Sequence, residues 1–95
     1  MSAYVVANVE VNDPEGYREY TQQVPGTLEP YGGRFVVRGG DLQVCEGSPL
    51  PRLVVIEFPS AEQASAWYNS PEYQAIISIR HQNASCNFLV IAPGV

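Results

Sequence analysis

The stretch Tyr31–Gly40 reads YGGRFVVRGG. Two glycine pairs enclose a short apolar run that has an arginine at each end, which predicts a β-strand, Arg34–Arg38, between two sharp turns. The first glycine pair is expected to end a helix, with one glycine in the left-handed conformation. The second pair suits a tight hairpin or a bulge, after which Asp41–Glu46 is expected to continue or return the strand. The chain has only five basic residues, all arginine. The presence of two of them on one short strand therefore suggests a structural or functional role for the pair.

The segment before this stretch predicts a strand followed by a helix. Ala3–Val11 reads AYVVANVEV and is rich in β-branched residues. Asp13 and Pro14 then open a helix, because aspartate caps free amide groups and proline fits the first helical position. Apolar residues recur near helical spacing at Tyr17, Tyr20, Val24, Leu28 and Tyr31. Pro25 and Gly26 interrupt the pattern and predict a kink or a break.

The segment after it predicts two more helices and two more strands. Arg52–Phe58 reads RLVVIEF, a continuous apolar run typical of a central strand. Ser60, with Gln63 three residues later, forms a capping box that begins a helix ending near Asn69. Ser70-Pro71 begins another helix by the same combination of cap and proline, and Asn87–Ala92 is the last strand.

The resulting order, β-α-β-β-α-β, predicts one α+β domain over residues 1–95 with the ferredoxin-like arrangement. Its antiparallel sheet would carry helices on one face only. The first and last strands are apolar on both faces, so the other face also needs cover. A twofold partner that packs sheet against sheet would provide it, and we expect a homodimer.

Composition and motifs exclude several classes of function. A net charge of −5 disfavours nucleic acid and anionic membranes as partners. We find no signal peptide and no apolar run long enough for a membrane helix. Cys45 and Cys86 lie far apart outside any CxxC pattern, which favours a reduced pair and a cytoplasmic location. Nucleotide-binding and metal-binding motifs are absent, and we expect no cofactor and no metal.

The runs YVVANVEVNDPEGYREY, YGGRFVVRGG and RLVVIEFPSAEQASAWYNSPEYQ resemble the family called domain of unknown function 1330. The resemblance extends from Tyr4 to the last strand, and its most specific parts are Tyr31–Gly40 and Glu57–Tyr73. It implies a dimeric α/β barrel in which two ferredoxin-like sheets pack back to back. It implies no reaction. Related barrels include cofactor-independent monooxygenases of aromatic or polyketide substrates, haem-degrading enzymes and lactone isomerases, but these are analogies only.

Strand alternation places Arg34, Val36 and Arg38 on one face of their strand. Glu57 lies in an apolar strand, and a buried carboxylate needs a cation nearby. Arg38 is the first candidate for that cation. The pair is either an internal ion pair that fixes the strand register, or a glutamate that holds an arginine ready to grip a carboxylate or enolate.

The other candidates are a histidine and a set of aromatic and polar residues. His81, at a helix end, suits acid–base chemistry near neutral pH, although a solvated helix end is the simpler reading. A ligand pocket between helices and sheet would be lined by Tyr17, Arg34, Trp67, Tyr68, Asn69 and Tyr73. Trp67 and Tyr73 lie at inward positions and are more typical of core residues.

These residues lead to one main hypothesis and two alternatives. The main hypothesis is a homodimer that binds a small anionic or aromatic metabolite, and it leaves open whether the protein is also an enzyme that works without a cofactor. Arg38 would hold the anionic group, Glu57 would orient Arg38, and His81 or Tyr68 would move a proton. The first alternative is a non-catalytic dimeric module. The second is a monooxygenase-like protein, which requires an apolar cavity able to hold an aromatic ring.

Overall fold

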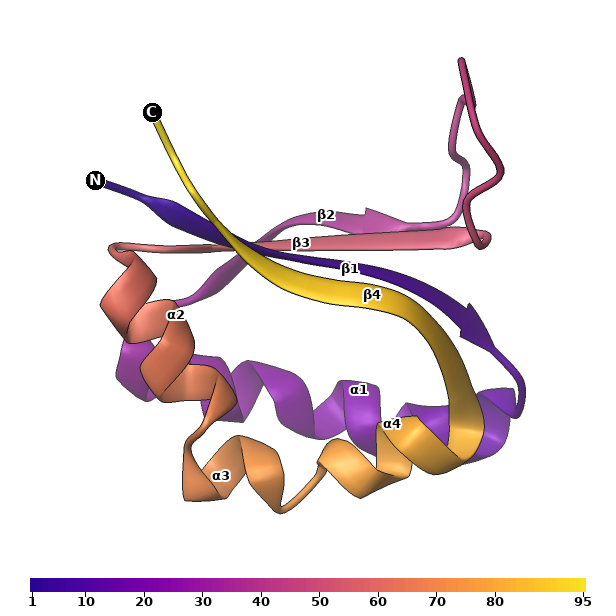
Figure 1. Cartoon of the computed structure of the whole chain (residues 1–95). Coiled ribbons are helices and arrows are strands. Elements are labelled where there is room, and N and C mark those ends of the chain that lie inside the picture. The colour runs from indigo at the N-terminus through magenta and orange to yellow at the C-terminus, as the bar shows by residue number, and fades with distance from the viewer.

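All helices of the chain lie on one face of a four-stranded antiparallel sheet (Figure 1). The structure is a computed structural model that describes residues 1–95. The elements are β1 (Ala3–Val11), α1 (Pro14–Leu28), a 3-10 turn η1 (Glu29–Tyr31), β2 (Arg34–Gly39), β3 (Arg52–Phe58), α2 (Ala61–Tyr68), α3 (Pro71–Gln74), α4 (Ile77–Asn83) and β4 (Ala84–Pro93). The strand order is β2-β3-β1-β4, with β1 and β3 in the centre. This order confirms the predicted α+β, ferredoxin-like fold.

The predicted caps begin three of the helices. The Asp13 carboxylate accepts hydrogen bonds from the amides of Glu15 and Gly16, at 3.1 and 3.3 Å. The Ser60 hydroxyl accepts from the Gln63 amide at 3.1 Å, and Ser70 caps α3 in the same way. Each cap satisfies a backbone donor that has no partner inside its helix.

Three local expectations differ from the structure. The alternative of a break at Pro25 and Gly26 is wrong, since α1 runs from Pro14 to Leu28 with both residues on its exposed side. Asp41–Glu46 forms no strand. That segment runs on towards Pro49 and Pro51, which have no amide to donate to a ladder. The helix expected after Ser70 is divided into α3 and α4 at Ala75–Ile76.

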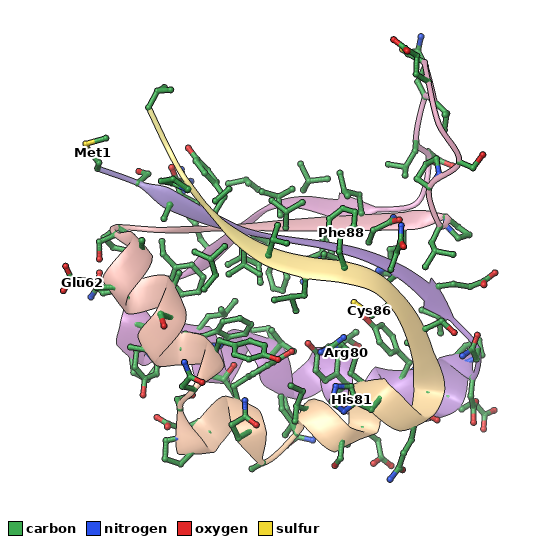
Figure 2. The ribbon with its side chains drawn as sticks, in the orientation of Figure 1. Met1, Glu62, Arg80, His81, Cys86 and Phe88 are labelled. Atoms are coloured by element: carbon green, nitrogen blue, oxygen red, sulfur yellow. The ribbon has the colours of Figure 1, made fainter.

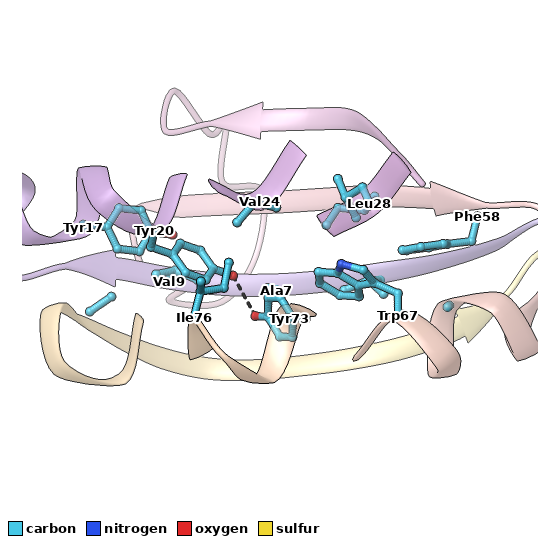
Figure 3. Close-up of a cluster of buried hydrophobic side chains, with 14 residues drawn as sticks. Ala7, Val9, Tyr17, Tyr20, Val24, Leu28, Phe58, Trp67, Tyr73 and Ile76 are labelled. Atoms are coloured by element: carbon cyan, nitrogen blue, oxygen red, sulfur yellow. Dashed lines mark hydrogen bonds between the residues drawn. The ribbon is translucent and has the colours of Figure 1, made fainter. Parts of the chain in front are cut away.

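The core lies between the helices and the inner face of the sheet (Figure 3). The side chains of Trp67, Tyr73 and Phe58 are among the largest that are fully buried. The polar atoms of Trp67 and Tyr73 are hydrogen-bonded. The Trp67 indole donates to Thr27 Oγ1 at 3.0 Å, and the hydroxyls of Tyr20 and Tyr73 lie 2.7 Å apart. The hydrogen-bonded aromatic residues therefore join α1, α2 and α3 into one layer.

The opposite face of the sheet, which we call the open face, carries no helix (Figure 1). Strand register places six apolar residues on it: Val6, Val37, Leu53, Val55, Phe88 and Val90. Phe88 is 40% exposed and Val90 47% exposed. The loop between β2 and β3 rises from this side of the sheet.

A bulge in β2 changes which residues share a face. Arg34 lies opposite Glu57 and Phe35 opposite Ile56, but Val37 then lies opposite Val55 and Arg38 opposite Val54. Val36 is therefore an extra residue in the ladder, and side chains after it are on the reverse of the expected face. Arg34 lies on the open face and Arg38 on the helix-covered face. The prediction that Arg34, Val36 and Arg38 share a face is wrong.

The glycines of the Tyr31–Gly40 stretch also yield a test. Gly32 has φ +72°, which confirms the expected left-handed residue. At Gly33, a Cβ atom would lie 2.7 Å from the buried Phe58 ring and 2.9 Å from Leu28. We expect Gly33→Ala to lower the free energy of unfolding by about 1–3 kcal/mol, because the core must shift to admit the methyl group. Urea denaturation measures this change.

Gly26→Ala is the matched control for this substitution. Gly26 lies on the exposed side of α1, with nothing within 4 Å of an added Cβ. Alanine should raise the free energy of unfolding by up to about 1 kcal/mol, because it favours helix. Equal stabilities for the two variants would contradict the packing role of Gly33.

Candidate functional site

Two adjoining hollows lie between α1 and the inner face of the sheet. The inner cavity is about 40 Å³ in volume and reaches Trp67, Tyr73 and Arg80. The outer groove is about 480 Å³ and opens along α1 past Pro14, Arg18 and Gln22. Tyr17, Thr21, Arg38 and Arg52 line both hollows and form the boundary between them. The groove has the size of a metabolite site, whereas the cavity holds only a few water molecules.

Arg80 is a buried cation without a counterion. Its side chain leaves α4 for the space under the sheet, and the residue is 5% exposed (Figure 2). Its Nε atom has no hydrogen-bond partner, while Nη2 lies 3.4 Å from His81 Nε2 and the Tyr73 hydroxyl is a further hydrogen-bonding neighbour of the guanidinium. Burial alone would lower the pKa of Arg80, but the phenol groups of Tyr73 and Tyr20 outweigh burial and raise it. The guanidinium is therefore charged at neutral pH.

Arg52 begins β3 at the boundary between cavity and groove. Its Nε atom is buried and has no partner. Its guanidinium lies over the Tyr17 ring, 5.8 Å from the centroid. The buried Asn8 amide donates to the carbonyls of Arg52 and Leu50, both at 3.0 Å, which fixes the backbone where Arg52 enters the sheet.

Arg38 and Arg18 complete the basic lining. The Arg38 guanidinium lies 4.5 Å from the centroid of the Phe35 ring and borders both hollows. Arg18 projects from α1 and borders the groove only. Neither residue forms an ion pair with a carboxylate. The stacked guanidinium of Arg38 keeps its N–H edge free for an oxyanion.

Two tyrosines, Tyr17 and Tyr20, supply neutral hydroxyl groups at the cavity. Burial raises the pKa of Tyr17, although Arg52 and Arg80 act against it. Burial also raises the pKa of Tyr20, and the adjacent hydroxyl of Tyr73 raises it further. Both Tyr17 and Tyr20 therefore keep their protons at neutral pH and can donate a hydrogen bond to an anion.

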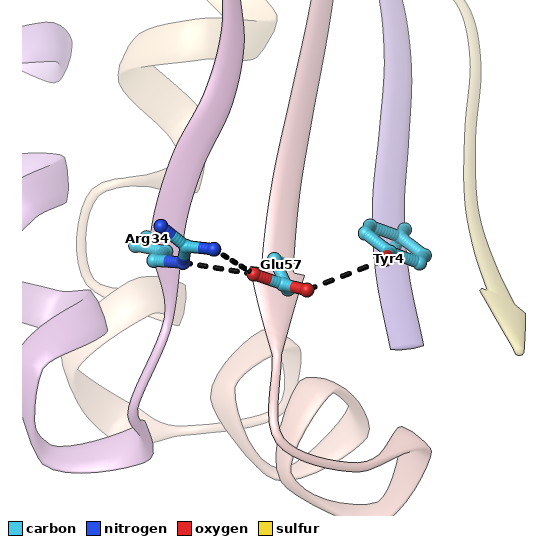
Figure 4. A network of polar contacts seen from close by, with 3 residues as sticks. All are labelled: Tyr4, Arg34 and Glu57. Atoms are coloured by element: carbon cyan, nitrogen blue, oxygen red, sulfur yellow. Dashed lines mark hydrogen bonds and ion pairs between the residues drawn. The ribbon is translucent and has the colours of Figure 1, made fainter. Parts of the chain in front are cut away.

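The expected pair of Arg38 and Glu57 does not form. Glu57 Oε1 accepts from Arg34 Nε at 2.8 Å, and Tyr4 donates to Oε2 at 3.2 Å (Figure 4). Hydrogen bonding from Arg34 lowers the pKa of Glu57. The bulge is the physical reason, since it places Arg38 on the face that Glu57 does not reach. The prediction that Glu57 orients Arg38 is therefore wrong.

The remaining predicted residues fall into two groups. Tyr17, Arg38, Trp67 and Tyr73 line the inner cavity. His81, Tyr68 and Asn69 line neither hollow: His81 is exposed on α4, Tyr68 packs against the core, and the Asn69 amide donates to the Ser65 carbonyl at 2.9 Å. Arg34, with Glu57, lies on the open face.

Sequence reasoning missed Arg52 and Arg80 as site residues. Arg80 follows Tyr73, Ile76 and Ile77 on one apolar side of its segment, and a cation on such a side was the available signal. Arg52 shares the inner face of β3 with Val54 and Ile56. Glu57, the residue of β3 that was predicted to act in the site, lies on the opposite face of that strand.

No cluster of three histidine, cysteine or acidic side chains lies close enough to bind a metal ion. Cys45 and Cys86 are both free thiols on the surface. None of the helices is long and apolar enough to span a bilayer.

The family comparison covers nearly the whole chain. Residues 2–94 match the model of the family described as Domain of unknown function (DUF1330). No curated protein matches the chain.

Solved structures share the fold at low sequence identity. RPA0582, a protein of unknown function from Rhodopseudomonas palustris, is 15% identical with a TM-score of 0.75, and the match covers 99% of this chain and 82% of that one. SnoaB, a cofactor-independent oxygenase from Streptomyces nogalater, is 7% identical with a TM-score of 0.70 and coverages of 99% and 93%. A putative antibiotic biosynthesis monooxygenase from Nitrosomonas europaea is 15% identical, with a TM-score of 0.57 and coverages of 98% and 90%. At these identities the similarity establishes the fold alone.

The buried charge of Arg80 leads to a stability prediction. Arg80→Met removes the charge and keeps an apolar chain of similar length, while Tyr20 and Tyr73 keep each other as partners. We expect the free energy of unfolding without ligand to stay the same or rise by about 1 kcal/mol, because burying an unpaired charge is costly. Urea denaturation measures this. A loss above about 2 kcal/mol would show that Arg80 stabilises the fold instead.

Proposed function

Because the chain belongs to the DUF1330 family, whose description names no reaction, we propose a function from its own site. The protein binds a small anionic metabolite where the inner cavity meets the outer groove. Arg80 and Arg52 hold the acidic group, and the body of the ligand occupies the groove. The observation that carries this proposal is the buried guanidinium of Arg80 without a counterion.

The chemistry of the boundary supports an oxyanion as the ligand group. Guanidinium groups bind carboxylates through paired N–H donors, and such bonds are strong where water is excluded. The inner cavity is enclosed mainly by apolar side chains, 12 of the 16 that line it. An oxyanion at its mouth would satisfy the free Nε atoms of Arg52 and Arg80.

The same donors suit a reaction that needs no cofactor. Guanidinium and phenol groups placed at the mouth of a dry cavity stabilise an enolate or a similar developing anion. A cofactor-independent enzyme acting on a small acid is therefore the catalytic form of the proposal, and a non-catalytic binding module is its alternative. Turnover of a bound acid separates the two.

The oxygenase-like alternative has less support from the site. Oxygenation of an aromatic ring needs an apolar space of ring size, and a cavity that takes up benzene measures roughly 150 Å³. The inner cavity is about 40 Å³. The outer groove is large enough, but only 2 of its 8 lining residues are hydrophobic.

Acids paired with their neutral amides test the proposal. Benzoate and butyrate should raise the melting temperature of the protein, while benzamide and butyramide should not, because only the acids neutralise Arg80. Arg80→Met should abolish the shift, and Arg34→Gln, which lies on the open face, should retain it. Equal shifts from acids and amides would contradict the proposal.

The proposal includes a second copy of the chain on the open face. Six apolar side chains share that face without a helix to cover them, and such a contiguous apolar surface is typical of an interface. A twofold axis through the sheet would bring the same residues of both copies together.

Sedimentation velocity at micromolar concentration tests the dimer. We expect the unaltered chain to sediment as a dimer and Val90→Glu to sediment as a folded monomer, because Val90 lies on the open face and is already 47% exposed. Ala66→Glu, on the exposed side of α2, should remain dimeric. An unaltered chain that sediments as a monomer would rule out this assembly.

A further inference from the structure

The arginines that form no ion pair all lie along the two hollows. The sequence has ten acidic residues and five arginines. The single ion pair joins Arg34 and Glu57 on the open face. Every other arginine borders the inner cavity or the outer groove, and no carboxylate pairs with any of them. A chain with net charge −5 thus keeps its unpaired positive charges along two adjoining hollows.

The arginines follow one another from the inner cavity to the outer groove. Arg80 borders the cavity only, Arg52 and Arg38 border both hollows, and Arg18 borders the groove only. Positive charge therefore extends from the buried end to the open end. One carboxylate at the buried end would leave the outer arginines without a partner.

Stacking contacts hold the middle of the series in place. Arg38 lies over Phe35 and Arg52 over Tyr17, so each guanidinium has one face covered by a ring. Arginine held in this way loses less conformational entropy when it binds an anion. Two guanidinium groups of the lining, those of Arg38 and Arg52, are thus positioned to bind anionic groups.

We propose that the ligand is an elongated small molecule with an oxyanionic group at each end. One group binds between Arg80 and Arg52, and the other binds in the groove between Arg38 and Arg18. This inference rests on the proposed function and adds the second acidic group. The outer group is a carboxylate or a phosphate, which share this chemistry.

A series of glutarate esters tests the second group, because its members differ mainly in charge. Isothermal titration calorimetry with glutarate, monomethyl glutarate and dimethyl glutarate compares two, one and no carboxylates. We expect glutarate to bind at least tenfold more tightly than the monomethyl ester, and the dimethyl ester not to bind. In ¹H–¹⁵N spectra of the arginine Nε–H groups, glutarate should shift Arg38 and Arg80 together, whereas the monomethyl ester should shift Arg80. Substituting 3-phosphonopropionate for glutarate shows which oxyanion the outer end prefers.

Two arginines of β2 supply a matched pair of variants. Arg38→Gln and Arg34→Gln change the net charge equally and lie on the same strand, but on opposite faces. Arg38→Gln should reduce the preference for glutarate over its monomethyl ester to less than threefold, and Arg34→Gln should keep it.

The outcomes separate the two proposals. If both acids bind equally and both lose binding in Arg80→Met, the proposed function stands and the second anionic group is wrong. If neither acid binds, the proposed function itself is wrong. If Arg34→Gln weakens the preference as much as Arg38→Gln, the effect is one of net charge and the second group is again wrong.

Discussion

The two-residue period of a β-strand, interrupted in β2 at Val36, determines which face of the sheet each arginine of that strand reaches. Without the extra residue, Arg34 and Arg38 would project on the same side of β2. With it, Arg34 pairs with Glu57 on the open face, while Arg38 lies opposite Val54 on the inner face and borders both hollows. One bulge thus separates a structural ion pair from a cation that is free to bind.

The buried Arg80 favours the binding of an anion but lowers the stability of the unliganded fold. The core of α1, α2 and α3 is well satisfied, since the Trp67 indole and the Tyr20 and Tyr73 hydroxyls all have partners. Arg80 lies beside this core with an unpartnered Nε atom. An unpaired buried charge destabilises a small domain, so its presence has to be explained by something other than folding. An anionic ligand would stabilise the folded chain as it binds, because it binds the native state only.

Local signals in the sequence predicted the helices and strands. The residues that form the site depend on how strands pair, which is not a local property of the sequence. The β-branched run of Ala3–Val11 and the caps at Asp13, Ser60 and Ser70 act within a few residues, so their reading needs no partner strand. A bulge exists only relative to the neighbouring strand, and nothing in FVV shows which residue will be the extra one. The pairing of Glu57 followed the bulge and was therefore mispredicted. Arg80 on α4 and Arg52 on β3 border the same cavity, which sequence spacing cannot show.

The open face and the site are linked through β2, where Val37 and Arg38 are consecutive residues on opposite faces. Val6, Val55 and Val90 occupy neighbouring strands in one row of the open face, while the pair of Arg34 and Glu57 lies in the row of Tyr4, nearer the end of the sheet. A second copy centred on the valines would leave the ion pair at the rim, where water still solvates it and the desolvation cost is small. It would also hold the edge strand β2 against β3, its one neighbour in the sheet. The backbone of Arg38 would then be held by β3 on one edge and by the second copy on the open face. A backbone held in this way keeps the guanidinium positioned before an anion binds.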